Sequence, residues 1–332
     1  MMKEKRKEQV LELIDFGLTK EMTKRTILVI GVGGCGCYIA SRMCAEHPDD
    51  VSYLLCESDY RAFVYSPVKD QLLLKDNNFG THCDIERGKK MAQEASDKIQ
   101  HLINEGTKMV FVLAGLGGGT GSGSSPVISG ITRKMGILTI GIVTTPLLFE
   151  NEAVLLCENK GLNDLRKTTD ALISVSNDYI WSLDGKLSED QAFDMADEIL
   201  IKSMMTIVDL INSRSQEGIN IDFNDVMFVL KDGGDSVVIS GKAEGEKRVM
   251  EAIKEALSSP LLYNKALRTA KRILLHTSTS SQFPLEIRET EELTSFTKSL
   301  HPQVNIIWGS STNESLERDV QVIIIASGLD KE

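Results

Sequence analysis

The sequence has no run of 18 or more apolar residues, so it predicts no transmembrane helix. Its N-terminus lacks the apolar core and small-residue cleavage site of a signal peptide. The six cysteines include no C-x-x-C pair, so neither a zinc site nor a disulfide framework is indicated. With only seven prolines and no repeated or Pro-rich stretch, no disordered linker is predicted. We therefore expect a cytoplasmic protein with free thiols and no direct transmembrane anchor.

Basic residues are in the minority, with 37 Lys and Arg against 48 Asp and Glu and a formal net charge of −11. A protein that binds a nucleic-acid backbone needs a net basic face, so no nucleic-acid partner is expected. A length of 332 residues exceeds what one small core requires and predicts two domains. The balance of 42% hydrophobic and 26% charged residues is typical of a folded globular chain.

Short, β-rich apolar runs alternate with helical stretches in the first half of the chain. These runs are almost continuously apolar, as expected for strands that helices cover on both faces. The sequence therefore predicts an α/β fold with a doubly wound parallel sheet whose carboxyl ends carry the site. The predicted strands cover 26–30, 51–56, 109–114, 137–143 and 171–176.

The second half of the chain begins with a long helical pattern. Apolar residues spaced by three or four from Ser188 to Ser213 predict one long helix. A smaller α+β unit follows, with strands near 236–240, 272–277, 304–308 and 320–326 and helices near 245–257 and 289–300.

Near the N-terminus, residues 3–17 place apolar side chains on one stripe behind a basic start. Such a helix packs on a domain more often than on an anionic membrane. The predicted organisation is an extension helix over 1–25, an α/β domain over 26–187, a central helix over 188–214 and a C-terminal domain over 215–332.

The first predicted strand ends in the glycine-rich segment GVGGCG at 31–36. A helix that opens directly after it would present bare backbone amides to a phosphate. The segment is also a G-x-G-x-x-G, and Glu57 stands where a dinucleotide-binding fold places its ribose-binding acid. Taken alone, this pattern leaves a nicotinamide-dependent enzyme open.

A second glycine-rich segment, GLGGGTGSG at 115–123, follows the strand at 109–114 and precedes a predicted helix from Pro126 to Lys134. Consecutive glycines fold around an anion without Cβ clashes, and the hydroxyls of Thr120 and Ser122 can donate to phosphate oxygens. A tight turn alone needs only one or two glycines. No glycine loop carries the Lys-Ser or Lys-Thr of a P-loop, so P-loop GTPases are excluded.

The run GGGTGSG at 117–123 matches the tubulin-superfamily signature GGGTG[ST]G, and the surrounding chain resembles the FtsZ family. The resemblance spans about 26–329. It includes FE at 149–150, ISVSND at 173–178, AFDMADEIL at 192–200, NIDFNDV at 220–226 and ALSSPLL at 256–262. It implies a tubulin/FtsZ-like fold and a GTPase that polymerises into filaments. It also implies GTP or GDP with Mg²⁺ as ligands, and a role in bacterial cell division or a related cytoskeletal process.

The same resemblance assigns contacts to the nucleotide. A carboxylate can accept both the ring N–H and the exocyclic amine of guanine, and Asp197 is that carboxylate. Asn177 also meets the base, Phe193 stacks on it, and Glu150 takes the ribose hydroxyls. Without the resemblance, a core role for Phe193 and a solvated helix charge at Asp197 would be favoured. The phosphates would rest on Gly33, Gly34, Gly36, Asp84, Gly117, Gly118, Gly119, Thr120 and Gly121.

Asp222 and Asp225 are three residues apart, so on a helix both carboxylates would lie on one face and could orient a water. Spacing alone favours helix capping instead. The resemblance implies that this loop reaches the γ-phosphate of a neighbouring subunit. A site completed in trans implies a head-to-tail homopolymer whose hydrolysis requires assembly. Mg²⁺ is expected with the phosphates, and no residue of the chain is assigned as a metal ligand.

The sequence departs from the family at several positions. Cys35 and Cys37 replace glycines, Tyr38 replaces an Asn, Val154 replaces an Arg and Thr145 replaces a Lys. We expect fewer sugar and phosphate contacts, which leaves the hydrolysis rate open. A thiol near a helix N-terminus can have a depressed pKa, although an inert, packed cysteine is favoured here.

The chain ends at Glu332, without the linker and C-terminal peptide through which the family reaches membrane adaptors. Adaptor binding is therefore not expected from this sequence, while division-associated proteins and the division site stay open. Three interpretations follow. The assembling GTPase leads, ahead of a non-hydrolysing nucleotide-binding scaffold and a dinucleotide-binding enzyme.

Overall fold

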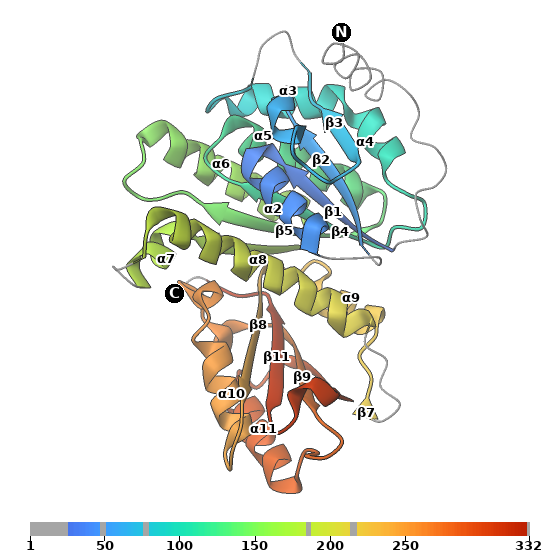
Figure 1. Ribbon diagram of the computed structural model, residues 1–332, viewed down its shortest axis with the longest axis vertical. Helices are drawn as coiled ribbons and strands as arrows, with labels where there is room; N and C mark the ends of the chain where they lie inside the picture. Colours follow the sequence, from blue (N-terminus) through green and yellow to red (C-terminus); the bar gives the residue numbers. More distant parts are fainter. Residues whose placement is uncertain (1–25, 47–50, 76–79, 184–186, 213–217, 331–332) are drawn as a thin grey trace. The chain divides into compact units, whose positions relative to one another are not determined.

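The computed structural model describes residues 26–46, 51–75, 80–183, 187–212 and 218–330 (Figure 1). The predicted extension helix over 1–25 lies outside the described residues. The chain divides into two compact units, Met1–Thr169 and Asp170–Glu332, called here the N-terminal and C-terminal units. The domain boundaries predicted near 187 and 214 stay a prediction.

The N-terminal unit contains a parallel sheet of strands in the order β3-β2-β1-β4-β5 (Figure 1). The order reverses between β1 and β4, which creates the switch point of a doubly wound sheet. Ligands bind at such a point because the connections leave the carboxyl ends of the two strands in opposite directions. The strands are β1 Ile27–Val32, β2 Val51–Glu57, β3 Asp70–Leu73, β4 Met109–Gly115 and β5 Leu138–Thr145.

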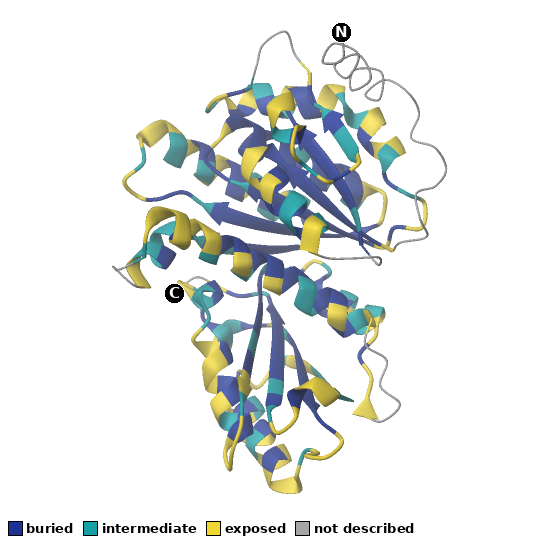
Figure 2. Cartoon of the chain, in the orientation of Figure 1, coloured by how far each residue is buried: buried dark blue, intermediate teal, exposed yellow. Residues whose placement is uncertain are grey.

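Helices cover this sheet, and its central strands are buried along their length (Figure 2). Helix α2 packs on β1, β2 and β4, and α5 packs on β4 and β5 with α3, α4 and α6 against it. This burial on both faces confirms the strands predicted from continuous apolar runs. The helices are α2 Gly33–Glu46, α3 Ile85–Glu94, α4 Ser96–Leu102, α5 Gly119–Lys134 and α6 Glu152–Thr168, with a 3-10 turn η1 at Tyr60–Phe63.

Helix α5 differs from its prediction, because it begins at Gly119 and not at Pro126. Glycine and serine are weak helix formers, so local propensity did not indicate a helix over the glycine-rich run. Packing against the preceding loop and α3 overrides that propensity. The consequence is that the glycine loop itself forms the first turns of the helix.

The C-terminal unit contains a mixed sheet in the order β6-β8-β11-β9-β10-β7. Strand β11 runs antiparallel to β8 and β9, whereas β9 and β10 are parallel. Helix α10 packs on β8 and β11, so this unit has the predicted α+β character. The strands are β6 Ala171–Ser176, β7 Gly218–Ile219, β8 Gly234–Ala243, β9 Arg272–Thr279, β10 Asn305–Thr312 and β11 Val320–Ser327.

The long helix predicted from Ser188 to Ser213 is confirmed as α8, Glu189–Asn212. Its buried residues recur at a spacing of three or four, as a helix that covers a core requires. The other helices of this unit are α7 Asn177–Leu183, α9 Phe223–Leu230, α10 Arg248–Leu257 and α11 Ile287–Ser299. The 3-10 turns are η2 Pro260–Leu262, η3 Leu267–Thr269 and η4 Glu314–Leu316.

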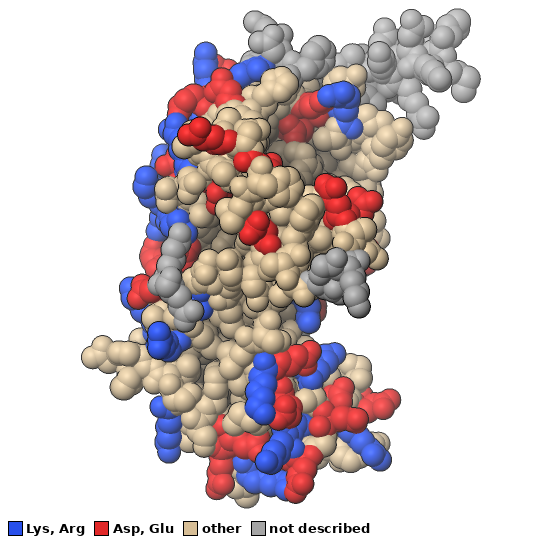
Figure 3. Space-filling view, turned by 90° about the vertical axis from the view of Figure 1, so that its left-hand side faces the viewer, with Lys and Arg blue, Asp and Glu red and all other residues tan. Residues whose placement is uncertain are grey.

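Figure 3 shows Lys and Arg mixed with Asp and Glu toward the lower end and the left-hand edge of the view, whereas the middle of this face is largely uncharged. Among the described residues, no helix combines the length and the apolar character needed to cross a membrane.

Candidate functional site

Gly33 brings the two glycine-rich loops together at the switch point between β1 and β4. It is the first residue of α2, directly after β1, and has φ of +75°, which favours glycine. A Cβ placed on it would lie 3.0 Å from the backbone nitrogen of Gly121 in α5. Two loops that the sequence separates by more than 80 residues are therefore in direct contact here.

A third segment, residues 80–84, joins the same place. Gly119 donates its N–H to the carbonyl of His82 at 2.5 Å, and a Cβ on Gly119 would lie 2.5 Å from the carbonyl oxygen of Asp84. Asp84 is the N-cap of α3, where its Oδ1 accepts from the Arg87 N–H at 3.0 Å. The segments 33–36, 80–84 and 117–121 are called here the cradle.

The cradle presents helix N-termini. Helices α2 and α5 begin within it, and Gly118, the N-cap of α5, makes no side-chain cap. The first amides of a helix have no acceptor within the helix and carry partial positive charge, so they suit an anion. Gly34 and Gly118 are exposed and leave the backbone accessible. Amides of this kind are what nucleotide phosphates require, and the predicted phosphate contacts stay a prediction.

Gly36 differs from the other predicted phosphate ligands. It is buried, and a Cβ there would lie 2.1 Å from the Leu113 carbonyl oxygen of β4. Close packing of α2 on β4 therefore explains this glycine by itself. Its contact with a phosphate stays a prediction.

The hydroxyls of Thr120 and Ser122 have partners within the protein, and their contact with a phosphate stays a prediction. Thr120 Oγ1 lies 2.8 Å from Ser58 Oγ and 2.7 Å from Thr81 Oγ1. Ser122 Oγ accepts from the Gly117 N–H at 2.9 Å and so closes the loop on its own helix. Sequence reasoning did not assign Ser58 or Thr81 to the site. The only signal was their position, since Ser58 follows Glu57 and Thr81 lies three residues before Asp84.

Glu57 lies at the end of β2 and is 5% exposed. Its Oε1 accepts from the Ser58 N–H at 2.6 Å, the Ser58 hydroxyl at 2.9 Å and the Asp59 N–H at 3.3 Å. Burial raises the pKa of this carboxyl, and the hydrogen bonds from Ser58 and Asp59 offset part of that rise. A carboxylate engaged in this way differs from the ribose-binding acid of a dinucleotide fold.

Three of the positions at which the sequence departs from the family, Cys37, Tyr38 and Val154, lie in different surroundings. Cys37 is buried against the Gly31 carbonyl, and burial raises its pKa well above the ordinary value, which confirms an inert packed thiol. Tyr38 is exposed on α2. A Cβ on Gly117 would lie 2.8 Å from Val154 Cγ1, so an aliphatic side chain borders the second loop.

Glu150 follows β5 at the same edge of the sheet. Its Oε1 accepts from the Leu147 N–H at 3.0 Å, and its own N–H donates to the Leu147 carbonyl. These two bonds close the turn between β5 and α6. They hold the half-buried carboxylate at the carboxyl end of the sheet, where the resemblance implies a ribose contact.

Three predicted base contacts belong to the C-terminal unit. Asn177 opens α7, and its Oδ1 is buried with no hydrogen-bond partner among the described residues. A buried acceptor of this kind calls for a donor. Phe193 and Asp197 lie on α8, where the Phe193 ring centroid is 6.2 Å from that of Trp181 on α7. The Asp197 carboxylate is 8% exposed and is therefore not the solvated helix charge of the alternative interpretation.

Asp222 and Asp225 form a capping box at the start of α9. Asp222 Oδ1 accepts from the N–H groups of Asn224 at 2.7 Å and Asp225 at 3.1 Å, and Asp225 Oδ2 accepts from the Asp222 N–H at 2.9 Å. The capping interpretation is therefore confirmed. Within the described residues, the second oxygen of each carboxylate has no such bond and can still orient a water.

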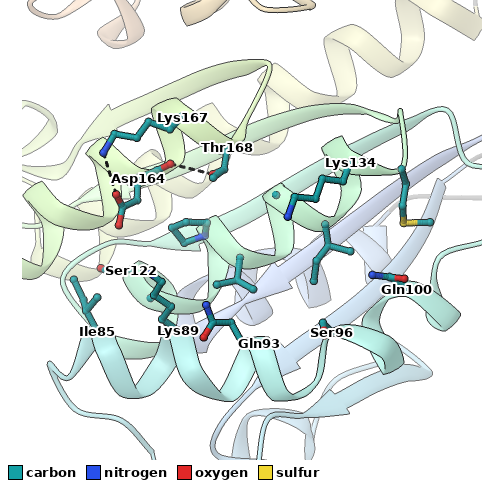
Figure 4. Close-up of a pocket in the computed structure, with 16 residues that line it drawn as sticks. Ile85, Lys89, Gln93, Ser96, Gln100, Ser122, Lys134, Asp164, Lys167 and Thr168 are labelled. Atoms are coloured by element: carbon teal, nitrogen blue, oxygen red, sulfur yellow. Dashed lines mark hydrogen bonds and ion pairs between the residues drawn. The ribbon is translucent and has the colours of Figure 1, made fainter.

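A separate pocket of about 690 Å³ lies along α5, between α3, α4 and α6 (Figure 4). Lys89, Lys134 and Lys167 line it from three helices, and Lys167 pairs with Asp164 at 3.4 Å. None of the predicted phosphate ligands lines it. In the part of the chain that the structure describes, no group of three His, Cys, Asp or Glu side chains is arranged to hold a metal ion.

Comparison with known proteins decides the family. The sequence model of the GTPase domain of the Tubulin/FtsZ family matches residues 26–184, and that of the FtsZ C-terminal domain matches residues 234–330. The cell division protein FtsZ of Porphyromonas gingivalis is 38% identical over 96% of this chain and 70% of its own length. The chain belongs to the tubulin/FtsZ family.

A second relative and a solved structure support the same family assignment. FtsZ 1 of Pyrococcus horikoshii is 34% identical over 93% of this chain and 82% of its own. The FtsZ dimer structure from M. jannaschii superimposes with a TM-score of 0.78 at 30% identity and covers 97% of this chain and 92% of that one. The fold predicted from the sequence is thus confirmed, and the dinucleotide-enzyme alternative is set aside. This chain is a GTP-binding, GTP-hydrolysing member of a polymerising cytoskeletal family.

Proposed function

We propose that the cradle holds the phosphates of GTP or GDP, that Glu150 binds the ribose, and that Asn177, Phe193 and Asp197 bind guanine. The contact between Gly33 and Gly121, which unites two helix N-termini at the switch point, carries this proposal. The buried Asn177 Oδ1, which lacks a donor among the described residues, and the buried Asp197 carboxylate support the base contacts. Both are acceptors that suit the donor edge of guanine.

Hydrolysis is completed in trans in this proposal. Asp222 and Asp225 of one subunit orient the attacking water on the GTP of the next, which requires a head-to-tail contact and an open filament. Each carboxylate uses one oxygen for the capping box. The other oxygen of each remains for the water, so one pair of residues can serve both roles.

Mg²⁺ supplies charge neutralisation across the β- and γ-phosphates when it is bound with the nucleotide. The described residues hold no group of acidic, histidine or cysteine ligands arranged for a metal ion, so we assign no protein ligand. The protein's part is to orient the phosphates on the backbone amides of the cradle.

The cellular role proposed is that of a cytoplasmic filament at the division site, with division-associated proteins as further partners. The relatives from Porphyromonas gingivalis and Pyrococcus horikoshii are named cell division proteins. This chain matches both the GTPase domain and the FtsZ C-terminal domain, so the proposal extends that role to it.

The test is the GTPase rate per subunit at increasing protein concentration, with sedimentation of the same samples. We expect the specific rate to rise with concentration, because the active site forms only on assembly. Asp225→Asn keeps an acceptor for the Asp222 N–H but removes the charge. It should leave GTP binding and sedimentation intact and lower the rate about tenfold or more. A specific rate that stays flat while filaments form would rule out completion in trans.

A further inference from the structure

Glu57 places a carboxylate directly beside the cradle. Its Oε2 lies 3.9 Å from where a Cβ of Gly34 would be, so the carboxylate borders the first glycine loop. In the part of the chain that the structure describes, no ion pair joins it to a Lys or Arg. Three donors, all from Ser58 and Asp59, converge on its Oε1. Burial without a positively charged partner destabilises the ionised form of a carboxylate. A further charge nearby therefore changes its protonation state readily.

A chain of hydroxyls connects this carboxylate to the cradle. Ser58 Oγ donates to Glu57 at 2.9 Å and lies 2.8 Å from Thr120 Oγ1, which is 2.7 Å from Thr81 Oγ1. All four side chains are less than a tenth exposed. The chain joins the end of β2, the first turn of α5 and the segment 80–84, which are the elements that surround the phosphate position.

The charge on Glu57 sets the direction of these hydrogen bonds. An ionised carboxylate only accepts, so the Ser58 proton points to Glu57. The Ser58 oxygen is then an acceptor for the Thr120 hydroxyl, which in turn accepts from Thr81. With Glu57 ionised, the Thr120 proton is used inward and is not available to a ligand.

We propose that phosphate binding at the cradle draws one proton from solvent onto Glu57, and that the neutral carboxyl reverses the chain so that Thr120 donates to a phosphate oxygen. Neutral Glu57 holds the proton on Oε2, while the N–H groups of Ser58 and Asp59 still satisfy its Oε1. The Ser58 hydroxyl is then released to donate to Thr120, and Thr120 donates outward. One O–H bond forms on Glu57 with the proton from solvent, and the two hydroxyls only rotate. Glu57 is thus a positioning residue that acts through Thr120. The inference rests on the proposed function, since it requires phosphates at the cradle.

The surroundings of Glu57 give the sign of the effect. Burial raises its pKa, and the neighbouring Asp59 charge, itself paired with Arg61, adds to the rise. Cys37 of α2 and Cys56 of β2 also face it, and burial and the Glu57 charge raise the pKa values of both thiols. A bound phosphate is a further anion, so it raises the Glu57 pKa again. Binding therefore takes up a proton, and affinity increases as pH falls through the pKa of the complex.

The test is calorimetric titration with a non-hydrolysable GTP analogue, from about pH 5 to about pH 8, which covers a raised carboxyl pKa. Two buffers of different ionisation enthalpy measure the protons taken up. On binding, wild type should take up as much as about one proton more than Glu57→Gln. As pH rises, the Kd of wild type should increase by as much as about tenfold per pH unit more than the Kd of the variant. Comparison with the variant removes the titration of the nucleotide's own phosphates.

Glu86→Gln is the matched control, because Glu86 is an exposed carboxylate in the first turn of α3 that pairs with Lys160. It should keep the wild-type proton uptake. A second variant, Ser58→Ala, removes one hydrogen bond to the carboxylate and also breaks the link from Glu57 to Thr120. The lost hydrogen bond raises the Glu57 pKa, so the pH dependence should move to higher pH. The lost link uncouples Thr120 from Glu57, so the pH dependence should also become weaker. This variant provides the test if Glu57→Gln does not fold.

Equal proton uptake by wild type and Glu57→Gln would overturn the inference, as would a pH profile that Ser58→Ala leaves unmoved. If the analogue does not bind wild type at any pH, the proposed function itself fails. The two failures are therefore distinguishable.

Discussion

Val154 lies beside the second glycine loop, where the family carries an Arg. A Cβ on Gly117 would be only 2.8 Å from its Cγ1, so this side chain closes the loop with an apolar surface. Position 154 is within the first turn of α6 and is half-buried. A longer side chain there can extend along the loop to solvent.

Val154→Arg is therefore predicted to strengthen GTP binding. A guanidinium at this position adds a charge-assisted hydrogen bond to a phosphate, worth about 1.5–3 kcal/mol, which corresponds to a decrease of about tenfold or more in Kd. Fluorescence titration with a labelled GTP analogue measures it. Val154→Met provides the control, since it fills similar space without charge. The prediction fails if both variants change Kd equally.

At the scale of elements, the cradle depends on how closely α5 approaches the N-cap of α3. Gly119 makes this approach feasible, because its donor bond to His82 and its contact with Asp84 leave no room for a side chain. The 80–84 segment and the first turn of α5 are thus held against one another by this close contact.

Gly119→Ala is predicted to separate these two elements and to weaken GTP binding at least tenfold, since a Cβ would lie 2.5 Å from the Asp84 carbonyl oxygen. Overpacking of this kind costs about 1–3 kcal/mol of folding free energy. Gly130→Ala, in the same helix, meets only ordinary contacts with Thr168 and is the control. Nucleotide affinity and thermal unfolding are measured for both. Equal affinity in the two variants would contradict the prediction.

At the scale of the whole molecule, completion of the site in trans predicts complementation between two inactive variants. Gly119→Ala subunits bind GTP poorly but retain Asp225, whereas Asp225→Asn subunits bind GTP but lack the charge. In a mixed filament, an Asp225→Asn subunit meets the intact Asp225 of a Gly119→Ala neighbour. In an equal mixture, half of the subunits supply bound GTP and half supply an intact Asp225. About a quarter of the contacts then bring the two together, so activity should recover to about a quarter of the wild-type level.

The measurement is phosphate release from the mixture compared with each variant alone at the same total concentration. Wild type mixed with an equal amount of the double variant gives the scale for recovery, because about a quarter of its contacts then join two wild-type subunits. A mixture that is no more active than the mean of its two components would show that each subunit completes its own site.

Much of this architecture follows from the sequence, because the signals are local. The apolar runs that became β1, β4 and β6 lie where they were predicted, and the glycine loops follow two of them. The capping box of Asp222 and Asp225 was also available from spacing. The short strands β3 and β7 were not predicted, because four and two residues carry too little periodicity to recognise.

The sequence by itself thus determined the family, the alternation of strands and helices and the positions of the two glycine-rich loops, since periodicity and glycine content are properties of neighbouring residues. Only the tertiary structure decided that α5 starts within its loop, that Gly36 serves close packing, and that Thr120 is bonded to Ser58 and Thr81. Those partners lie 62 and 39 positions away along the chain, and no local pattern relates them. A buried hydroxyl takes whichever partner the packed sheet places within reach, so the fold has to be known before the chemistry of Thr120 and Glu57 can be assigned.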